Sequence, residues 1–329
     1  MQTEAQLARD NPTTGIFFIV VGMLCISVND MLIKQLSGDY PLHQIIFFRS
    51  LVGISASLVI VQFEGGFSIL KTKTPGLHAL RGLLIVIANM AFFTALAVLP
   101  LADATALFFV APLFITLLSM LILGENVGPR RITAVLIGFG GVLIMLRPGG
   151  MHLNGDQSRL VLLLPVVAAL CYALMQILTR KLGVKTQASA MAVYIQGTFI
   201  VVSLGFWFIA GDGRFAASFE NESAQFLLRG WHWPADGDRP LFLGLGVVSA
   251  IIGYALSQAY RSADAATIAP FEYVALPLAI MWGWVVWGDL PDIYVAAGIV
   301  LIVGSGLYVF IRERRRKSPL RHRRAIRRW

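Results

Sequence analysis

Asp30, Arg49 and Glu272 are the residues whose types could do chemistry, because each places a formal charge inside a long apolar stretch of the chain. On insertion scales, a charged side chain in the middle of a bilayer costs about 2.5–3.5 kcal/mol, so it needs a partner or a water-filled cavity. Charges placed in this way are typical of sites that bind a polar substrate or pass a proton. These three residues are therefore the first candidates for a binding site.

Asp30 and Arg49 lie on consecutive apolar stretches, each about two helical turns from the short connection between them. An ion pair between them is feasible, and it can be purely structural or can belong to a cavity. The equivalent positions in the second half of the chain are Gln176 and Gln196, which are polar but uncharged. Because both halves offer polar groups at these depths, we predict that all four residues line a cavity.

Glu272 has no acidic counterpart, since the equivalent position in the first half is Ala111. This asymmetry favours a specialised role over a scaffold role. A buried carboxylate can exchange a proton or accept hydrogen bonds from a polar ligand, and the alternative is a hydrogen bond between packed helices. Tyr273 follows it and adds a phenol on a different face of the helix.

Aromatic and amide side chains on other apolar stretches could complete the same cavity. Rings stack on a planar heteroaromatic ligand, and amides hydrogen-bond its polar edge. The alternative for any single aromatic residue is a place in the core or against lipid. The residues predicted to join the site are Asn89, Phe93, Tyr172, Tyr254 and Gln258.

The composition favours a membrane protein. Hydrophobic residues make up 57% of the chain and charged residues 14%, whereas an ordinary soluble domain carries about 25% charged residues. Apolar runs long enough to cross a bilayer lie at residues 14–37, 42–63, 77–99, 101–123, 130–147, 158–180, 188–210, 240–260, 265–287 and 292–312. We therefore predict an all-α membrane protein with ten transmembrane helices.

No pattern in the chain indicates catalysis, a metal site or a cofactor. The five histidines lie in or near predicted loops and the tail without ligand spacing, and no P-loop is present. The net charge of +9 equals the charge of residues 312–329, which hold ten basic residues against Glu313. The basic balance therefore predicts a tail attracted to anionic lipid, and not a protein that binds nucleic acid.

The chain repeats itself. Ala102-Asp103-Ala104 returns as Ala263-Asp264-Ala265, and Leu123-Gly124-Glu125 returns as Trp287-Gly288-Asp289. The match spans residues 14–147 and 158–312, which indicates a duplication. Because five helices per copy is an odd number, the second copy enters the membrane from the opposite side. The prediction is two inverted five-helix repeats around a central cavity, followed by a basic tail at residues 313–329.

Lys and Arg gather on one side of this topology. With the N-terminus inside, the inside segments hold most of them, including Lys71, Lys73, Arg81 and the tail. The positive-inside rule then places both termini in the cytoplasm. Residues 211–239 lie outside, where aromatic residues among polar ones predict an amphipathic segment at the membrane interface, with a disordered loop as the alternative.

Several runs carry a resemblance to a known family. They are Phe92-Phe93-Thr94-Ala95-Leu96, Pro100-Leu101-Ala102-Asp103-Ala104, Pro112-Leu113, Leu123-Gly124-Glu125, Gly138-Phe139-Gly140-Gly141, Ala269-Pro270-Phe271-Glu272-Tyr273, Gly288-Asp289-Leu290-Pro291 and Ser305-Gly306-Leu307-Tyr308. With these runs the chain resembles the EamA-type domain of the drug/metabolite transporter superfamily. The resemblance implies a bacterial inner-membrane carrier that moves small metabolites by alternating access, and a homodimer is a further prediction.

Within that family, the pattern from Asp30 to Lys34, Arg49 and the run around Glu272 resemble the riboflavin and S-adenosylmethionine branch. This implies riboflavin uptake as the first expectation. Uptake of S-adenosylmethionine and export of amino-acid-like metabolites or metallophores are alternatives. A membrane-embedded enzyme or a structural membrane subunit is the alternative from another class.

Overall fold

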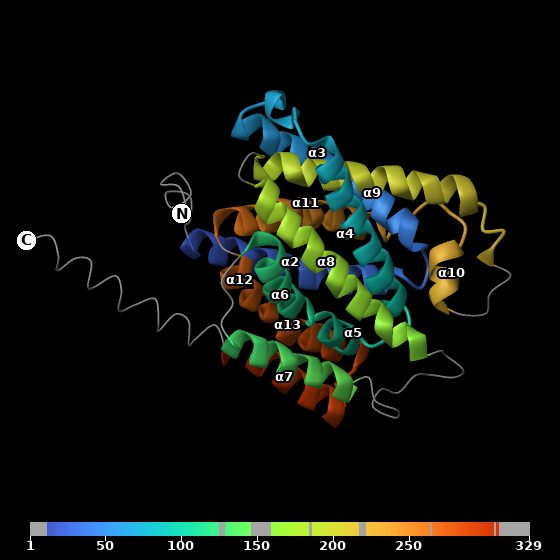
Figure 1. The fold of residues 1–329 in the computed structure, drawn as a ribbon. Helices are drawn as coiled ribbons and strands as arrows, with labels where there is room; N and C mark the ends of the chain where they lie inside the picture. Colours follow the sequence, from blue (N-terminus) through green and yellow to red (C-terminus); the bar gives the residue numbers. More distant parts are fainter. Residues whose placement is uncertain are drawn as a thin grey trace, which may run out of the picture.

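The structure is a computed structural model, and it describes residues 12–124, 129–145, 159–183, 186–216, 222–263, 265–305 and 307–308. These ranges consist of helices joined by turns and short loops, and they contain no strand. Figure 1 shows the long helices gathered into one bundle, with α7 at its lower edge. The predicted basic tail, residues 313–329, lies outside the described residues.

Within the residues that the structure describes, seven helices are long and apolar enough to cross a membrane, by their length and composition. They are α2 (Pro12–Leu36), α3 (Leu42–Glu64), α4 (Pro75–Leu96), α5 (Leu101–Phe108) with α6 (Ala111–Leu123), the 3-10 turn Arg159–Leu163 with α8 (Leu164–Leu182), α9 (Ala188–Ala210) and α11 (Arg239–Ser262). A bilayer core about 30 Å thick needs about 20 helical residues. The chain is a multi-pass membrane protein.

Three shorter apolar helices accompany them. These are α7 (Pro129–Met145), the stretch Phe271–Trp287 and the helix Ile293–Ser305. Each of the ten predicted segments therefore contains helix. The boundaries differ by a few residues: the segment predicted at 77–99 ends at Leu96, because Pro100 has no N–H and disfavours helical backbone at the residue before it.

Two of the predicted segments are interrupted. The fourth divides into α5 and α6 at Phe109 and Val110, with Pro112 in the first turn of α6. The ninth consists of α12 (Ala265–Ile268), a 3-10 turn (Ala269–Val274), α13 (Ala275–Trp282) and a π-helical turn (Gly283–Trp287). Pro270 opens the 3-10 turn. Each interruption lies where a proline removes a backbone donor.

Contacts between distant segments define two ends of the bundle. At the end where α2 starts, Gly15 lies against Ala259 and Ile268. At the end where α2 stops, the Nζ of Lys34 donates hydrogen bonds to the carbonyl oxygens of Leu96 (3.1 Å) and Leu99 (2.6 Å). We call these the Pro12 end and the Leu36 end.

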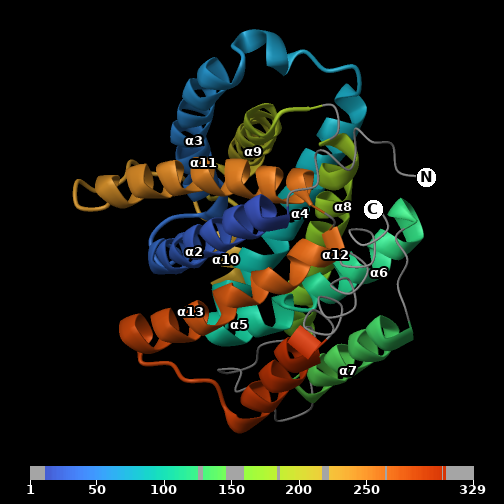
Figure 2. The same cartoon turned by 90° about the vertical axis from the view of Figure 1, so that its left-hand side faces the viewer.

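Helices from the two halves of the chain pack against each other in matched pairs. α2 packs on α11, α4 packs on α8, and α3 packs on α9. Figure 2 shows α7 beside the final helix, away from the centre of the bundle. A Cβ on Gly298 would lie 2.9 Å from the carbonyl oxygen of Gly141. These glycines therefore allow the two helices to approach closely within one chain.

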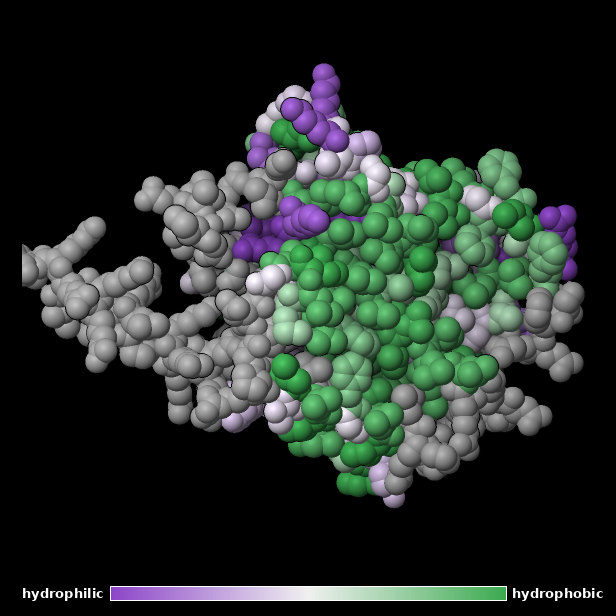
Figure 3. Space-filling model, viewed as in Figure 1, coloured by the Kyte–Doolittle hydropathy of each residue, from purple (hydrophilic) through white to green (hydrophobic). Residues whose placement is uncertain are grey.

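The outer surface carries apolar side chains in the way that lipid contact requires. The face in Figure 3 is hydrophobic over its centre, and hydrophilic residues gather towards its margins. Large exposed apolar residues occur on most of the long helices, among them Phe17, Val59, Leu121, Leu136, Val201, Phe208, Leu243 and Val300. Exposed apolar area on this scale on a soluble protein would mark an interaction site, and here it faces lipid.

The connection between α9 and α11 packs across the Leu36 end. It contains α10 (Glu222–Leu228), and the buried Phe226 anchors that helix. The Tyr40 hydroxyl donates to Asp238 (2.7 Å) and accepts from the backbone N–H of Ala235 (2.9 Å). The side chain of Gln44 donates to the carbonyl oxygen of His232. The described part of this connection is thus held against the turn between α2 and α3.

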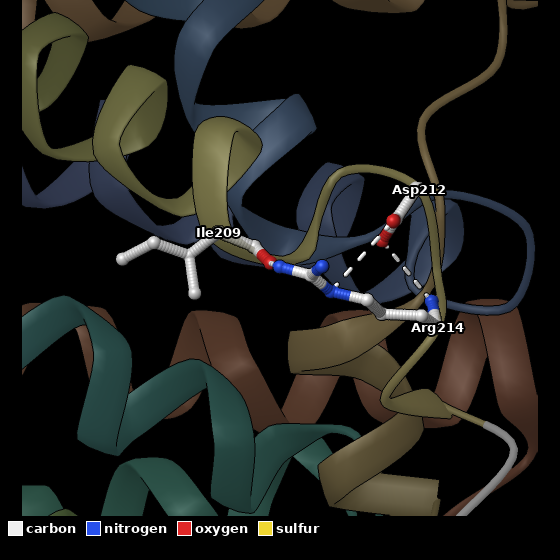
Figure 4. Close-up of polar contacts among 3 residues, drawn as sticks. All are labelled: Ile209, Asp212 and Arg214. Atoms are coloured by element: carbon white, nitrogen blue, oxygen red, sulfur yellow. Dashed lines mark hydrogen bonds and ion pairs between the residues drawn. The ribbon is translucent and has the colours of Figure 1, made fainter.

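An exposed turn follows α9. The guanidinium of Arg214 donates to the carbonyl oxygen of Ile209 (2.8 Å), and its Nε lies 3.7 Å from the Asp212 carboxylate (Figure 4). A cation at this position interacts favourably with the carbonyl groups at the end of a helix. Because both charged side chains are mostly exposed, the pair adds little to stability.

Candidate substrate cavity

One internal cavity contains most of the predicted site residues. It is lined by side chains of α2, α3, α4, α5, α8, α9 and α11 and of the ninth segment, so both halves of the chain contribute. Its volume is about 140 Å³, measured as the space open to the centres of water molecules. The predicted residues that line it are Asp30, Arg49, Asn89, Phe93, Tyr172, Gln176, Gln196 and Glu272.

Arg49 is the centre of a polar cluster in the half of the cavity near the Leu36 end. One terminal nitrogen donates to Oδ1 of Asn29 and the other to Oδ1 of Asn89, both at 2.9 Å. The guanidinium also lies 5.1 Å from the centre of the Phe199 ring, a cation–π distance. Arg49 is 4% exposed, so its position is fixed by α2, α4 and α9 together.

The predicted ion pair between Asp30 and Arg49 is not direct. The amide nitrogen of Asn29 donates to the Asp30 carboxylate (3.0 Å), and the amide oxygen of the same residue accepts from Arg49. Asn29 therefore connects the two charges through one amide. Sequence reasoning selected the comparable amides Asn89 and Gln176 but missed this residue, which lies next to the charge of Asp30.

Glu272 accepts two hydrogen bonds from phenols on neighbouring helices. Tyr172 of α8 donates at 2.9 Å and Tyr260 of α11 at 2.5 Å, both to the same oxygen, Oε1. The carboxylate is 1% exposed and borders the cavity. Within the described part of the chain, Oε2 has no hydrogen-bond partner. Glu272 lies in the 3-10 turn Ala269–Val274, where the regular helix of the ninth segment is interrupted.

The two glutamines that align with Asp30 and Arg49 also border the cavity. Gln196 donates from Nε2 to the hydroxyl of Ser249 (2.9 Å). Both polar atoms of the Gln176 amide are buried, and the amide lies beside the Tyr172 hydroxyl without a well-formed hydrogen bond to any described residue. A buried amide in this state lacks the compensation that buried polar groups almost always have. A ligand or water in the cavity could supply it.

Aromatic rings form the wall between these polar groups. Phe92 and Phe108 have ring centres 5.3 Å apart, and Phe108 and Tyr172 are again 5.3 Å apart, both in edge-to-face geometry. Phe93, Phe109 and Phe199 also line the cavity. The arrangement offers apolar walls with hydrogen-bonding groups at separate points, the usual design of a small-molecule site.

Three predicted site residues lie elsewhere. Tyr254 donates to Glu64 (3.0 Å) near the Pro12 end of the bundle. Gln258 accepts from Arg261 one turn later on α11 (3.1 Å). Tyr273 is buried behind the cavity wall, with its ring 5.6 Å from that of Phe109. None of these three residues borders the cavity.

Comparison with known proteins identifies the family of this chain. The EamA-like transporter family model matches residues 13–147. A riboflavin transporter from Rhizobium johnstonii is 31% identical over 318 residues, covering 96% of this chain and 97% of that protein. The chain belongs to the EamA-like transporter family. It is therefore a membrane transporter and not an enzyme.

Other relatives of this EamA-like transporter are similar over comparable lengths. An S-adenosylmethionine uptake transporter from Rickettsia prowazekii is 26% identical, covering 92% of this chain and 95% of that protein. The pseudopaline exporter of Pseudomonas aeruginosa is 27% identical, covering 88% and 93%. The fold also matches that of a protein solved by crystallography, with a TM-score of 0.68 and 19% identity. The match covers 93% of this chain and 99% of that chain.

Arg81 is the cavity residue of this transporter that sequence reasoning placed most differently. We predicted it in a cytoplasmic segment, but it lies within α4, 2% exposed, and borders the cavity. The helix begins at Pro75, a residue favoured in a first turn. The predicted segment 77–99 already contains Arg81, and its position close to the start of the helix led us to assign its charge to the cytoplasmic side.

Proposed function

We propose that the protein is a secondary transporter that binds a polar metabolite with a planar aromatic part in this cavity and moves it by alternating access. The observation that carries the proposal is the composition of one cavity wall: aromatic rings between separate polar groups, contributed by both halves of the chain. A site between two halves can open to either side when the halves rock against each other. The eight lining residues predicted from the sequence form the proposed binding site.

The proposed architecture is ten membrane-crossing helices in two inverted repeats, residues 14–147 and 158–312. The packing pairs support it. If α2 and α4 are equivalent to α8 and α11, the α2–α11 contact is the same pair as the α8–α4 contact. The pair α3 and α9 and the pair α7 and Ile293–Ser305 would each lie across the pseudo-two-fold axis. Inverted repeats of this kind recur in secondary transporters.

The proposed location is the inner membrane of a bacterium, with both termini in the cytoplasm. Two observations support this orientation. The turn that carries Lys71 and Lys73 and the ends of α8 and α11, with Arg180 and Arg261, lie towards the Pro12 end. The connection packed across the Leu36 end holds fewer basic residues. The positive-inside rule assigns the first of these ends to the cytoplasm.

Riboflavin is the first substrate to test. The flavin ring is planar and has an edge of hydrogen-bond donors and acceptors, which matches phenylalanine rings beside Asn89 and Gln176. Its hydroxylated chain would suit the polar cluster around Arg49. The similarity to the Rhizobium riboflavin transporter adds support.

S-adenosylmethionine is a second candidate, which the charged groups favour. The cavity is bordered by two buried arginines, Arg49 and Arg81, and two carboxylates, Asp30 and Glu272. S-adenosylmethionine carries a carboxylate, two cationic groups and an adenine ring, so each part would have a complementary group. The similarity to the Rickettsia transporter is consistent with this alternative.

The test is uptake by bacteria that cannot make riboflavin and lack their own riboflavin transporter. Cells expressing the protein receive radiolabelled riboflavin, with and without unlabelled S-adenosylmethionine as competitor, and a parallel strain receives labelled S-adenosylmethionine. Uptake above the empty vector identifies the substrate, and we expect the Asp30→Asn variant to lose most of it. Glu64→Gln is the matched control, because Glu64 does not border the cavity. Absence of both activities, with the protein present in the membrane, contradicts both substrates.

A further inference from the structure

Arg81 is a buried cation that no carboxylate neutralises within the described part of the chain. Its three hydrogen bonds go to neutral oxygens: the Thr179 hydroxyl (2.6 Å), the Met191 carbonyl (3.0 Å) and the Ser257 hydroxyl (3.1 Å). A guanidinium has five N–H donors, so one N–H on each terminal nitrogen has no partner among the described residues. Buried charges are normally paired, so the missing anion requires an explanation.

The two buried arginines of the cavity differ in whether a carboxylate is linked to the guanidinium. Arg49 is connected to the Asp30 carboxylate through Asn29. Arg81 lies eight residues before Asn89 on α4, about 12 Å away along the helix. The two guanidinium groups therefore lie towards opposite ends of one cavity, and the one nearer the Pro12 end has no acidic neighbour in contact.

A second observation points to the same place. Gln176 precedes Thr179 by one helical turn on α8, so the two side chains share a face of that helix. Thr179 holds Arg81. The Gln176 amide beside it is buried, borders the cavity and, apart from its approach to the Tyr172 hydroxyl, makes no well-formed hydrogen bond within the described ranges. A cation without a carboxylate in contact and an amide donor without a well-formed hydrogen bond thus border the same part of the cavity.

We propose that Arg81 and Gln176 form a subsite that binds a carboxylate group of the transported substrate. The planar fork of a guanidinium fits a carboxylate with two parallel N–H···O bonds. The amide nitrogen of Gln176 supplies a further donor. This inference rests on the proposed transport function and names the substrate class, a metabolite with an acidic end group. It favours S-adenosylmethionine over riboflavin, which has no carboxylate.

The charge balance of the cavity limits that class further. Asp30 and Glu272 offset Arg49 and Arg81 in formal charge, so a bound ligand with a lone carboxylate would leave the site negative. A zwitterion brings its own cation, for which the Oε2 atom of Glu272 is available. The subsite therefore favours a substrate with a carboxylate and a cation close together.

The test compares ligands that differ by one carboxylate. Purified full-length protein in lipid nanodiscs is titrated with S-adenosylmethionine and its decarboxylated analogue, and with carboxymethylflavin and lumiflavin, and heat release is measured. We expect the wild type to bind S-adenosylmethionine at least about tenfold more tightly than its decarboxylated analogue. The flavin pair, which lacks a cation, should show a smaller preference. The Arg81→Gln variant should reduce the ratio of the first pair to about one, whereas Arg81→Lys keeps part of it.

Arg180→Gln is the matched control, since Arg180 lies towards the same end of the bundle without bordering the cavity. It should leave the ratio unchanged. A wild type without preference in the S-adenosylmethionine pair overturns the proposal, and so does a preference that survives Arg81→Gln. An equal loss for both members of a pair would show that Arg81 only holds α4 to its neighbours. Cellular uptake by the wild type decides the transport function separately from these ratios.

Discussion

Tyr172 donates a 2.9 Å hydrogen bond to Oε1 of Glu272, although 100 residues separate them in the sequence. Tyr260 donates to the same oxygen. Two phenols on different helices thus fix one side of the carboxylate. This arrangement leaves the other oxygen, Oε2, for a ligand or a proton, and it suits a group that changes its partner during transport.

The first prediction concerns Glu272→Gln. A glutamine can still accept from both phenols through its amide oxygen, so we expect the protein to fold and reach the membrane. The amide nitrogen then takes the place of Oε2, donates hydrogen bonds instead of accepting them and carries no charge. Initial uptake of the substrate should therefore fall at least about tenfold, the loss expected when a charged hydrogen-bonded group is removed. Uptake rates normalised to the amount of membrane protein measure this. Tyr260→Phe removes one donor only and should cost less, whereas wild-type uptake by Glu272→Gln would contradict a role for the carboxylate.

The second prediction concerns the indirect link between Asp30 and Arg49. Asp30→Asn and Arg49→Met should each destabilise the protein, and the double variant should lose less than the sum by about 1 kcal/mol, within the range for residues of one polar network. The physical reason is that Asn29 holds both groups. Unfolding by SDS titration in mixed micelles gives the free energies. The pair Asp30→Asn and Arg81→Gln shares no partner and serves as the additive control; equal coupling in both pairs would refute the link.

The residues that sequence reasoning identified are those whose polarity is conspicuous in an apolar run. Asp30, Arg49 and Glu272 are costly to bury in a bilayer, so their placement at a cavity could be anticipated. Arg81 was missed because it lies in the second turn of α4, where a cation resembles a loop charge. The position of Tyr273 could not be anticipated, because the 3-10 turn Ala269–Val274 changes the angle between successive side chains.

The fold, like the site, could be predicted from the sequence only in part. The positions of the helices follow from runs of apolar residues of bilayer length, and the match between the two halves led to the repeat. The contact of Gly141 with Gly298 joins helices far apart in the sequence. The glycines on each of these helices indicated only that a neighbouring helix packs closely against them. Which partner does so depends on the packing of the whole bundle.

The third prediction uses that contact. Gly298→Ala should lower the free energy of unfolding by about 1–3 kcal/mol, the usual cost of overpacking, because the new Cβ would lie 2.9 Å from the Gly141 carbonyl oxygen and 2.3 Å from Cγ of Met145. Gly140→Ala is the matched control on α7. Its Cβ would have no atom within 4 Å, and alanine is the better helix former by up to about 1 kcal/mol. Thermal midpoints in detergent should therefore fall for Gly298→Ala and stay or rise for Gly140→Ala, and the reverse order would refute the contact.

The fourth prediction concerns orientation and uses three glycines at which an added Cβ would meet no atom within 4 Å: Gly38, Gly76 and Gly237. Gly38 and Gly237 flank the contact of Tyr40 with Asp238 at the Leu36 end, and Gly76 lies in the first turn of α4 at the Pro12 end. In a background with Cys25 and Cys171 replaced by serine, we expect a membrane-impermeant maleimide to label the Gly38→Cys and Gly237→Cys variants in intact cells. The Gly76→Cys variant should react only after the membrane is permeabilised, because the positive-inside rule places that end in the cytoplasm. Labelling of Gly76→Cys alone in intact cells would reverse the orientation, and labelling of all three would show that Gly76 is reached from outside through the cavity.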